Sequence, residues 1–296
     1  MGPLLLHSVS YAGLWGQAFL SLDQFIDKAA DLGYQGVMLM AKRPHLSVLD
    51  YGAEECRRLR AKLEARDLRS VCIAGYTNFC ADLEHGDIPH REIQTQHVTD
   101  LARMAQALGG SMVRIFTGYE NSAASYQAQW KLLVETLREC ARRASDYGVT
   151  IGVQNHHDLA VGYETMYDLI CAVNEPNCRA MFDAWAPYLH GADLPAAAKK
   201  LAPLTVHTTI ADYQLRPRYR YLPSVVNYAA EAPLAQAAPM GQGAIDYRGF
   251  LSALWGAGSN ASAAYEMCSP LLAGGGMEAL DQYARTFLEY MSQFRS

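Results

Sequence analysis

The sequence lacks several features that would place it in common classes of protein. It has no block of Lys and Arg, and its 25 basic groups against 30 acidic groups give a formal net charge of −5. A net negative chain is poorly matched to phosphate backbones and to anionic lipid. No apolar run approaches the ~20 residues that a membrane-spanning helix needs. We therefore expect neither nucleic acid nor a membrane as a partner.

The cysteines and the N-terminus exclude further classes. Seven cysteines are scattered along 296 residues without a CxxC pair, and an odd number of them does not indicate a disulfide framework. No basic residue precedes the short apolar run at residues 4–6, so the N-terminus does not have the pattern of a secretory signal. We expect reduced thiols and a soluble, cytoplasmic protein.

What the sequence does contain is a regular alternation of short apolar runs with longer stretches of helical spacing. Half of the residues are hydrophobic and 19% are charged, which is enough for a sizeable core. The predicted strands are 4–8, 36–40, 70–74, 111–116, 150–154, 179–183, 204–208 and 262–267. The predicted helices are 22–32, 53–65, 90–108, 126–147, 163–173, 194–201, 247–255 and 277–294.

This alternation predicts an α/β fold. Strict strand-helix order requires parallel strands joined by right-handed crossovers, and eight such units close most naturally into a (β/α)8 barrel. An open doubly wound sheet is the alternative, but the glycine-rich phosphate turn typical of it is missing. We predict a single barrel domain over residues 1–296, with a long loop after the seventh strand. The tyrosines in that loop, 211–240, favour an ordered lid over the barrel mouth.

Four consecutive predicted strands end in groups that bind metals. The fifth ends in the run 154–158, the sixth in Asp183, the seventh in His207 and the eighth in Glu266. Active sites of such barrels lie at the carboxyl ends of the strands, so Asp183, His207 and Glu266 would converge there if each faces inward. Carboxylate and imidazole ligands suit a divalent ion, Mn²⁺ first, then Mg²⁺ or Co²⁺, with Zn²⁺ and Fe²⁺ as alternatives. A helix cap or a core histidine would explain any one of them alone.

In this order the strand ends resemble the xylose-isomerase-like TIM-barrel superfamily of sugar isomerases and epimerases, over nearly the whole chain. The segment 239–247, of the form P-x-G-x-G-x-x-D-Y, resembles the one that precedes the last helical unit of those proteins. The resemblance implies a metal held by Glu, Asp, His and Glu from strands five to eight. Asp183, His207 and Glu266 match three of these positions, and Gln154 stands at the first.

Gln154 changes the chemistry that the resemblance implies. In the ketose epimerases of the superfamily, two metal-bound carboxylates give and take the proton at one carbon. An amide offers a metal its carbonyl oxygen but cannot act as a general base. The base would then be Glu266, or His156 two residues beyond Gln154 on the same face. A role in capping the loop or supporting a ligand is the alternative for His156.

Further candidates surround the same rim. We predict that the substrate is bound by residues that follow the second, sixth and seventh strands: Lys42, His45, Trp185, His190 and Asp212. Cations suit hydroxyls or a carboxylate, and an aromatic ring stacks on a sugar. Solvated loops and plain core packing would account for the same residues. His7 and Arg114 lie on the first and fourth strands and are candidates as well.

Three functions remain open. The first is a metal-dependent isomerase or epimerase that removes a proton next to the carbonyl of a ketose-like sugar or sugar derivative. The second is a lyase or hydratase on a keto-sugar or keto-glycoside, because elimination needs one base where epimerisation uses a pair. The third is a non-catalytic binding barrel with a degraded metal site. The DNA-repair endonucleases of the superfamily fit badly, since they need a larger His/Glu cluster and a basic groove. The relatives are usually dimers or tetramers, which leaves a homo-oligomer open.

Overall fold

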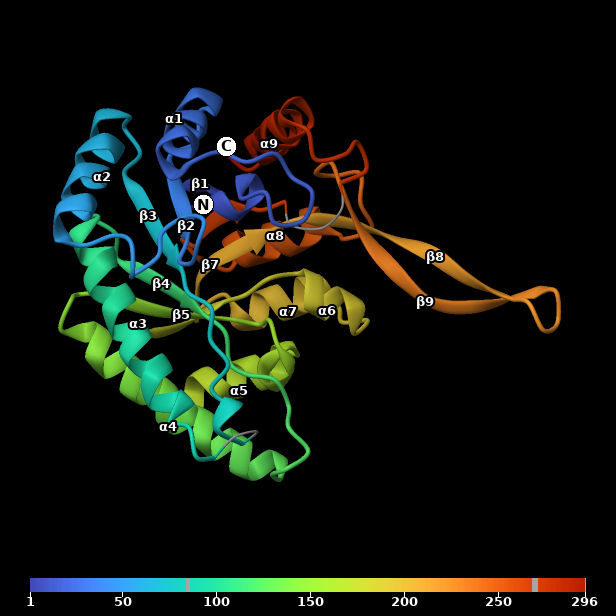
Figure 1. Cartoon of the computed structure of the whole chain (residues 1–296), viewed down its shortest axis with the longest axis horizontal. Coiled ribbons are helices and arrows are strands. Elements are labelled where there is room, and N and C mark those ends of the chain that lie inside the picture. The colour runs from blue at the N-terminus through green and yellow to red at the C-terminus, as the bar shows by residue number, and fades with distance from the viewer. Residues whose placement is uncertain (84–85, 268–270, 296) are drawn as a thin grey trace.

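Eight parallel strands close into a barrel in the computed structural model, which describes residues 1–83, 86–267 and 271–295 (Figure 1). Their order around the barrel is β1-β10-β7-β6-β5-β4-β3-β2, which confirms the predicted fold class. The strands are β1 (Leu4–His7), β2 (Gly36–Met40), β3 (Ser70–Ala74), β4 (Met112–Ile115), β5 (Thr150–Gln154), β6 (Cys178–Met181), β7 (Thr205–Ile210) and β10 (Ser262–Tyr265). Asp183 and Glu266 thus lie just beyond the ends of their strands.

Helices surround this barrel, one or two after each strand. They are α1 (Leu22–Leu32), α2 (Ala53–Ala65), α3 (His90–Ala107), α4 (Tyr126–Ser145), α5 (Tyr163–Val173), α6 (Trp185–Leu189), α7 (Leu194–Leu201), α8 (Tyr247–Gly256) and α9 (Met277–Ser292). Short 3-10 turns are η1 (Ser8–Tyr11), η2 (Ala81–Leu83) and η3 (Asp158–Ala160). The sequence did not predict α6. No helix in the described part of the chain is both long and apolar enough to span a membrane.

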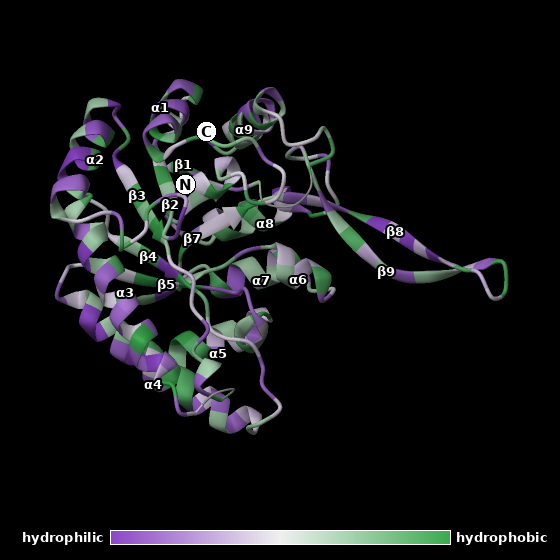
Figure 2. Ribbon diagram, in the orientation of Figure 1, coloured by the Kyte–Doolittle hydropathy of each residue, from purple (hydrophilic) through white to green (hydrophobic). Residues whose placement is uncertain are grey.

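The alternation of side chains along each strand separates two apolar layers. Leu4 and Leu6 point outward and pack against the helices, whereas Leu5 points into the barrel with Met38 and Met181. In Figure 2 the strands are largely hydrophobic, whereas hydrophobic and hydrophilic residues alternate along the surrounding helices. Small residues leave room inside: a side chain on Gly152 would overlap Met181. The interior is therefore a packed core that ends below the strand tips.

The segment 211–240 differs from the prediction. Instead of a loop it forms an antiparallel ribbon, β8 (Asp212–Leu222) and β9 (Asn227–Ala238). The ribbon projects away from the barrel, so it is not a lid over its own mouth (Figure 1). The sequence did not indicate these two strands, because prolines interrupt both of them and no Asn-Gly or Asp-Gly pair marks the turn.

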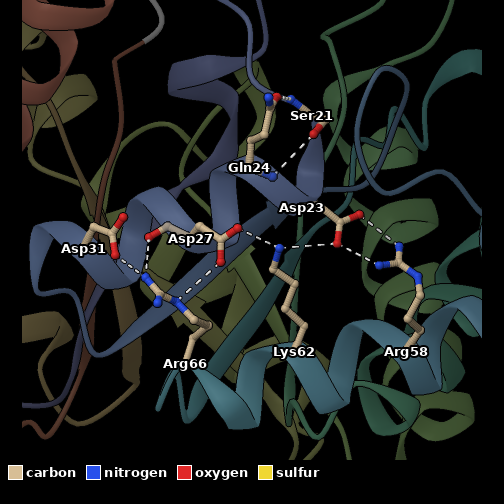
Figure 3. Close-up of polar contacts among 8 residues, drawn as sticks. All are labelled: Ser21, Asp23, Gln24, Asp27, Asp31, Arg58, Lys62 and Arg66. Atoms are coloured by element: carbon tan, nitrogen blue, oxygen red, sulfur yellow. Dashed lines mark hydrogen bonds and ion pairs between the residues drawn. The ribbon is translucent and has the colours of Figure 1, made fainter.

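Ionic contacts join α1 to α2 on the outer surface (Figure 3). Arg58 donates hydrogen bonds of 2.7 and 3.0 Å to Asp23, and Lys62 donates one of 2.8 Å to Asp27. Ser21 caps the start of α1 through the predicted capping box. Exposed pairs of this kind contribute about 0 to 1 kcal/mol each. They orient the two helices, while the free energy of folding comes mainly from the core.

The start of β2 provides a test of the barrel packing. A methyl group on Gly36 would overlap the backbone oxygen of Ser70 on the neighbouring strand, which cannot move without breaking the sheet. We expect Gly36→Ala to lower the free energy of unfolding by about 3 kcal/mol, measured by urea denaturation. Gly256→Ala is the control, because nothing lies near that position at the end of α8, and it should be neutral or stabilising by up to about 1 kcal/mol. Equal stabilities of the two variants would contradict this packing.

Candidate active site

Two adjoining pockets open at the carboxyl ends of the barrel strands. The first has a volume of about 570 Å³, and the second about 500 Å³. His156 and His157 line both pockets. The polar residues of the first pocket include Lys42, Arg114, Gln154 and Glu266, and those of the second include Asn155, Asp183 and His190. Of the predicted strand-end residues, Gln154 and Glu266 line the first pocket and Asp183 lines the second, whereas His207 lines neither.

Asp183 is held at the centre of this region by its neighbours. One carboxylate oxygen accepts a hydrogen bond of 2.6 Å from the backbone of Thr209, and the other accepts one from the amide of Gln154. Asn155 clamps the Asp183 backbone from both sides, at 2.7 and 2.9 Å. The pKa of Asp183 is raised to about 7: burial is the main cause and the nearby Glu266 contributes, while the hydrogen bonds from Thr209 and Gln154 oppose the rise. A buried carboxyl group of this kind gains strongly from a cation.

His207 lies fully buried and carries an unused ring nitrogen. Its Nδ1 is 2.6 Å from Ser262 Oγ, while Nε2 has no hydrogen-bond partner. Burial, and then the charge of Arg114, lower its pKa to about 3, so the ring is neutral. If Nδ1 carries the proton and donates it to Ser262, Nε2 presents a lone pair, which is the state of a histidine that binds a metal.

Glu266 faces His7, which the sequence analysis named only as a further candidate on the first strand. Its Oε2 lies 3.6 Å from His7 Nε2. His7 Nδ1 accepts a hydrogen bond of 3.2 Å from the backbone of Val9, so the proton of the neutral ring is on Nε2, toward the carboxylate. Burial, and then Arg114, lower the pKa of His7 well below its usual value. At 3.6 Å the two groups are too far apart for a hydrogen bond, so His7 Nε2, like His207 Nε2, is a buried ring nitrogen without a hydrogen-bond partner.

Arg114 brings an unexpected positive charge into the barrel. Its side chain points inward from β4 where Ala74 and Gly152 of the flanking strands leave space. The guanidinium is buried and packs over the rings of Phe116 and Tyr76, at 4.1 and 4.8 Å. Its Nε and Nη1 have no hydrogen-bond partner. Buried guanidinium donors without partners indicate a position for an anion.

Lys42 adds a second cation to the first pocket. Its Nζ lies 4.1 Å from the centre of the Tyr76 ring, on which Arg114 also packs. Burial, and then Arg114, lower the pKa of Lys42. The two cations share one aromatic surface and line the same pocket.

His156 and His157 form the wall between the two pockets. Their Nδ1 atoms are 2.7 Å apart, and the backbone of His157 donates to His156 Nδ1 at 3.1 Å. His157 has a φ of 60°, which is uncommon for a side chain of this size and typical of functional sites. Burial, and then His157 and Arg114, lower the pKa of His156, which keeps its ring neutral and able to accept a proton.

Two predicted substrate ligands lie elsewhere. His45 is in the core between the rings of Phe19 and Phe25, with Nε2 at 3.0 Å from the Leu20 carbonyl. Asp212 accepts backbone hydrogen bonds of 2.9 Å from both Gly241 and Gly243. Neither residue lines the two pockets. His45 packs the first loop, and Asp212 anchors the glycine segment 239–243, so the structure gives both a structural role, and substrate binding by either one stays a prediction.

Trp185 and His190 line the second pocket, but both are engaged with their neighbours. The ring of Trp185 packs on Tyr213 with centroids 4.4 Å apart. His190 Nδ1 lies 2.8 Å from the Ala186 carbonyl. Residues missed by the sequence are Asn155 and Ser262, whose roles depend on contacts between strands that no local pattern shows.

The proposed metal ligands are brought together only in part. Among residues 1–83, 86–267 and 271–295, no three His, Cys, Asp or Glu side chains are arranged to hold a metal ion in this conformation. The amide of Gln154 fills the space beside Asp183. The donor chemistry nevertheless fits a divalent ion, because His207 Nε2 is unused and Asp183 is a desolvated carboxylate. Turning the Gln154 amide would present its oxygen in place of its nitrogen.

This architecture defines a barrel with a polar site at its mouth, and the comparisons agree with it. Residues 26–285 match the family described as xylose isomerase-like TIM barrel. The chain therefore belongs to this family, which confirms the resemblance seen in the sequence.

The relatives are distant. A curated relative from Escherichia coli O157:H7, fructoselysine 3-epimerase, is 21% identical over 218 residues, or 70% of this chain and 78% of the relative. The probable 3-DHS dehydratase AsbF from Bacillus anthracis has a similar structure, with a TM-score of 0.73 and 18% identity over 97% of this chain and 99% of that one. The IOLI protein with a bound zinc atom has a TM-score of 0.75 and 18% identity, over 98% of each chain.

Buried neutral histidines give a testable pH dependence. Since the folded pKa of His45 is lowered, the unfolded chain binds more protons below about pH 6.5, and stability falls as the pH falls. Replacing His45 with Phe should flatten this decline by up to about 1.4 kcal/mol per pH unit. Urea unfolding at pH 7, 6 and 5 measures it. His190→Phe is the control and should keep the wild-type slope, because His190 is exposed. Parallel curves for His45→Phe and wild type would refute the assignment.

Proposed function

We propose that this protein is a divalent-metal-dependent enzyme that removes a proton next to the carbonyl of a keto-sugar derivative. The observation that supports the proposal is that two neighbouring strand ends carry unused ligand groups: the Nε2 of buried His207 has no hydrogen-bond partner, and the Asp183 carboxylate is desolvated. The ligands would be Gln154, Asp183, His207 and Glu266, with Mn²⁺ as the first candidate and Mg²⁺, Co²⁺ or Zn²⁺ as alternatives. Bound there, the ion would polarise the substrate carbonyl and so acidify the neighbouring carbon.

The proton would move through Glu266 and His156. Gln154 cannot take a proton, so the pair of carboxylates used by ketose epimerases is incomplete. Glu266 lines the first pocket, 3.6 Å from His7 Nε2, and carries a carboxylate, which makes it the proposed base. His156 lines the same pocket and is neutral, so it could take up the proton that Glu266 has removed and then, as the imidazolium, return it to carbon or protonate a leaving group.

The substrate is proposed to carry an acidic group. Arg114 and Lys42 bring two cations to one wall of the first pocket, and the unpartnered donors of Arg114 match a carboxylate or a phosphate. A neutral ketose would leave these donors unpaired, at a cost of about 1 to 3 kcal/mol. The second pocket leaves room for the remainder of the sugar.

The leading reaction is isomerisation or epimerisation, as in the epimerases to which the chain is similar. A lyase or dehydratase reaction is the second candidate. It is favoured by Gln154, because elimination needs only one base, and a probable dehydratase is among the similar structures. A non-catalytic binding barrel with a degraded metal site is the remaining alternative. The two enzymatic candidates share proton removal and differ in the fate of the resulting carbanion.

Metal binding tests the ligand set. We expect Asp183→Ala and His207→Ala to lose Mn²⁺ binding, measured by titration calorimetry and by metal content after dialysis, because each removes one of four ligands. Gln154→Glu should tighten binding by about tenfold, or roughly 1.4 kcal/mol, through the added charge. His190→Ala is the control and should bind like wild type. Retained stoichiometric metal in both ligand variants would refute the assignment.

The reaction is tested by incubating the Mn²⁺-loaded protein with keto-sugars in D₂O. Deuterium at the carbon next to the carbonyl, followed by NMR, is the expected result, and the product separates epimerisation from elimination. Arg114→Met should raise the KM for acidic substrates by about 100-fold, or roughly 2.7 kcal/mol, and should raise the KM for neutral ketoses much less. A metal-loaded protein that exchanges no proton on any substrate would favour the binding barrel.

A further inference from the structure

The amino group of Lys42 differs in its surroundings from those of the other five lysines. Three of the others pair with carboxylates, and two are exposed on α7; they are Lys28, Lys62 and Lys131, and Lys199 and Lys200. Lys42 instead lines the first pocket. The proposed function uses only its positive charge, which an arginine would provide as well.

The backbone holds Lys42 at the carboxyl end of β2. The amide of the preceding residue, Ala41, donates a hydrogen bond of 3.0 Å to the carbonyl of Ala74 at the end of β3. The carbonyl of Lys42 accepts a hydrogen bond of 2.9 Å from the backbone of His45. These two bonds fix the start of the side chain beside the strand ends, from where its amino group reaches the pocket.

The amino group lies against aromatic rings. Its Nζ is 4.1 Å from the centre of the Tyr76 ring and 6.0 Å from the centre of the Trp15 ring. In the part of the chain that the structure describes, no carboxylate forms an ion pair with Lys42, and the charged neighbour that acts on its amino group is Arg114. The ammonium form of Lys42 therefore has the weak attraction of a ring in place of a counter-ion.

These surroundings favour the neutral amine. Burial, and then the charge of Arg114, lower the pKa of Lys42. Enzymes obtain a nucleophilic lysine by the same means, since a partly desolvated amino group near a second cation loses its proton more readily. Near neutral pH, a larger fraction of Lys42 than of an exposed lysine is in the form that attacks a carbonyl carbon.

Arg114 provides a position for the acidic end of a molecule that reacts with Lys42. Its Nε and Nη1 have no hydrogen-bond partner, although the side chain is buried. Lys42 and Arg114 both pack on the ring of Tyr76 and line the same pocket of about 570 Å³. One small molecule can thus place an anion at Arg114 and a carbonyl group at the amine.

We propose that Lys42 forms a Schiff base with aldehydes and ketones that carry a carboxylate or phosphate group. This inference rests on the part of the proposed function that places an acidic group at Arg114, but it requires no metal ion. It also restricts the reacting molecule to its open-chain form. The carbonyl group of a cyclic sugar is masked, and such a sugar would react only after its ring opens.

The reaction is a condensation that releases one water molecule. The lone pair of neutral Nζ attacks the carbonyl carbon, and a proton moves from nitrogen to the carbonyl oxygen, which gives a carbinolamine. The hydroxyl group takes a proton from solvent and leaves as water, while the nitrogen lone pair forms the C=N bond. The protonated imine carries one positive charge, as the lysine does, so its contact with Tyr76 is kept.

Reductive labelling of the full chain tests the inference. The protein is incubated near neutral pH, in EDTA, with para-formylbenzoate and cyanoborohydride, which adds hydride to the imine and leaves a stable secondary amine. Peptide mass spectrometry then identifies the modified lysines. We expect Lys42 to be labelled about tenfold faster than Lys199 or Lys200, because its amine is less protonated. Equal labelling of all three lysines would overturn the inference.

Matched probes test the role of the acidic group. Para-formylbenzamide is the neutral counterpart of para-formylbenzoate, and glycolaldehyde is the neutral counterpart of glycolaldehyde phosphate. The charged member of at least one pair should label Lys42 about tenfold faster, because its anion binds Arg114. The pair that shows the preference identifies the acidic group as a carboxylate or a phosphate. Equal rates within both pairs would contradict the proposal.

Two lysine variants complete the test. Lys42→Arg keeps the charge but cannot form an imine, so the fast labelling should be lost. Lys131→Arg, on the surface of α4, is the matched control and should be labelled like wild type. Mn²⁺ titration of Lys42→Arg should match that of wild type, since Lys42 is not a proposed ligand. A protein that is labelled at Lys42 but binds no metal would support this inference and contradict the proposed function.

Discussion

The chemistry of the site depends on two charged side chains that are buried inside the barrel. Asp183 and Arg114 are both buried near the strand ends, and each changes the ionisation of the groups around it. Arg114 contributes to the lowered pKa values of His7, His156 and His207. The same charge opposes the burial penalty of Asp183. Burial is the main cause that keeps these histidines neutral, and the charge of Arg114 adds to it. Neutral imidazole is the state that binds a metal or accepts a proton.

This arrangement also limits the ligands that the site accepts. A divalent ion beside Asp183 adds positive charge to a region that already holds Arg114. An anionic substrate would compensate both charges at once, which joins the proposed metal and the proposed acidic substrate in one electrostatic argument. Gln154 reduces the negative charge of the proposed ligand set by one relative to a glutamate. An anionic substrate would then have to supply more of the negative charge that neutralises the metal ion and Arg114.

Much of the fold was predictable, because the signals for it are local. Each strand is a short apolar run, and turns such as Gly33, with a φ of 92°, end the helices where the sequence indicates. The ribbon was not predictable as strands, since Pro217 and Pro233 interrupt its pattern. Asp183, His207 and Glu266 could be found as polar ends of apolar strands. His45 and Asp212 satisfy the same pattern, and only contacts between distant segments distinguish a core histidine or a loop anchor from a substrate ligand.

Asn155 has a consequence for how such a barrel can diversify. Its side chain accepts a hydrogen bond from the backbone amide of Asp183 and donates one to the Asp183 carbonyl, and so connects the end of β5 to the segment that follows β6. These two hydrogen bonds fix the position of the Asp183 carboxylate relative to the barrel strands and make it independent of the loops that follow the strands. Insertions and substitutions in those loops can then accumulate and change which molecules enter the pockets. The position of the Asp183 carboxylate at the strand ends stays the same.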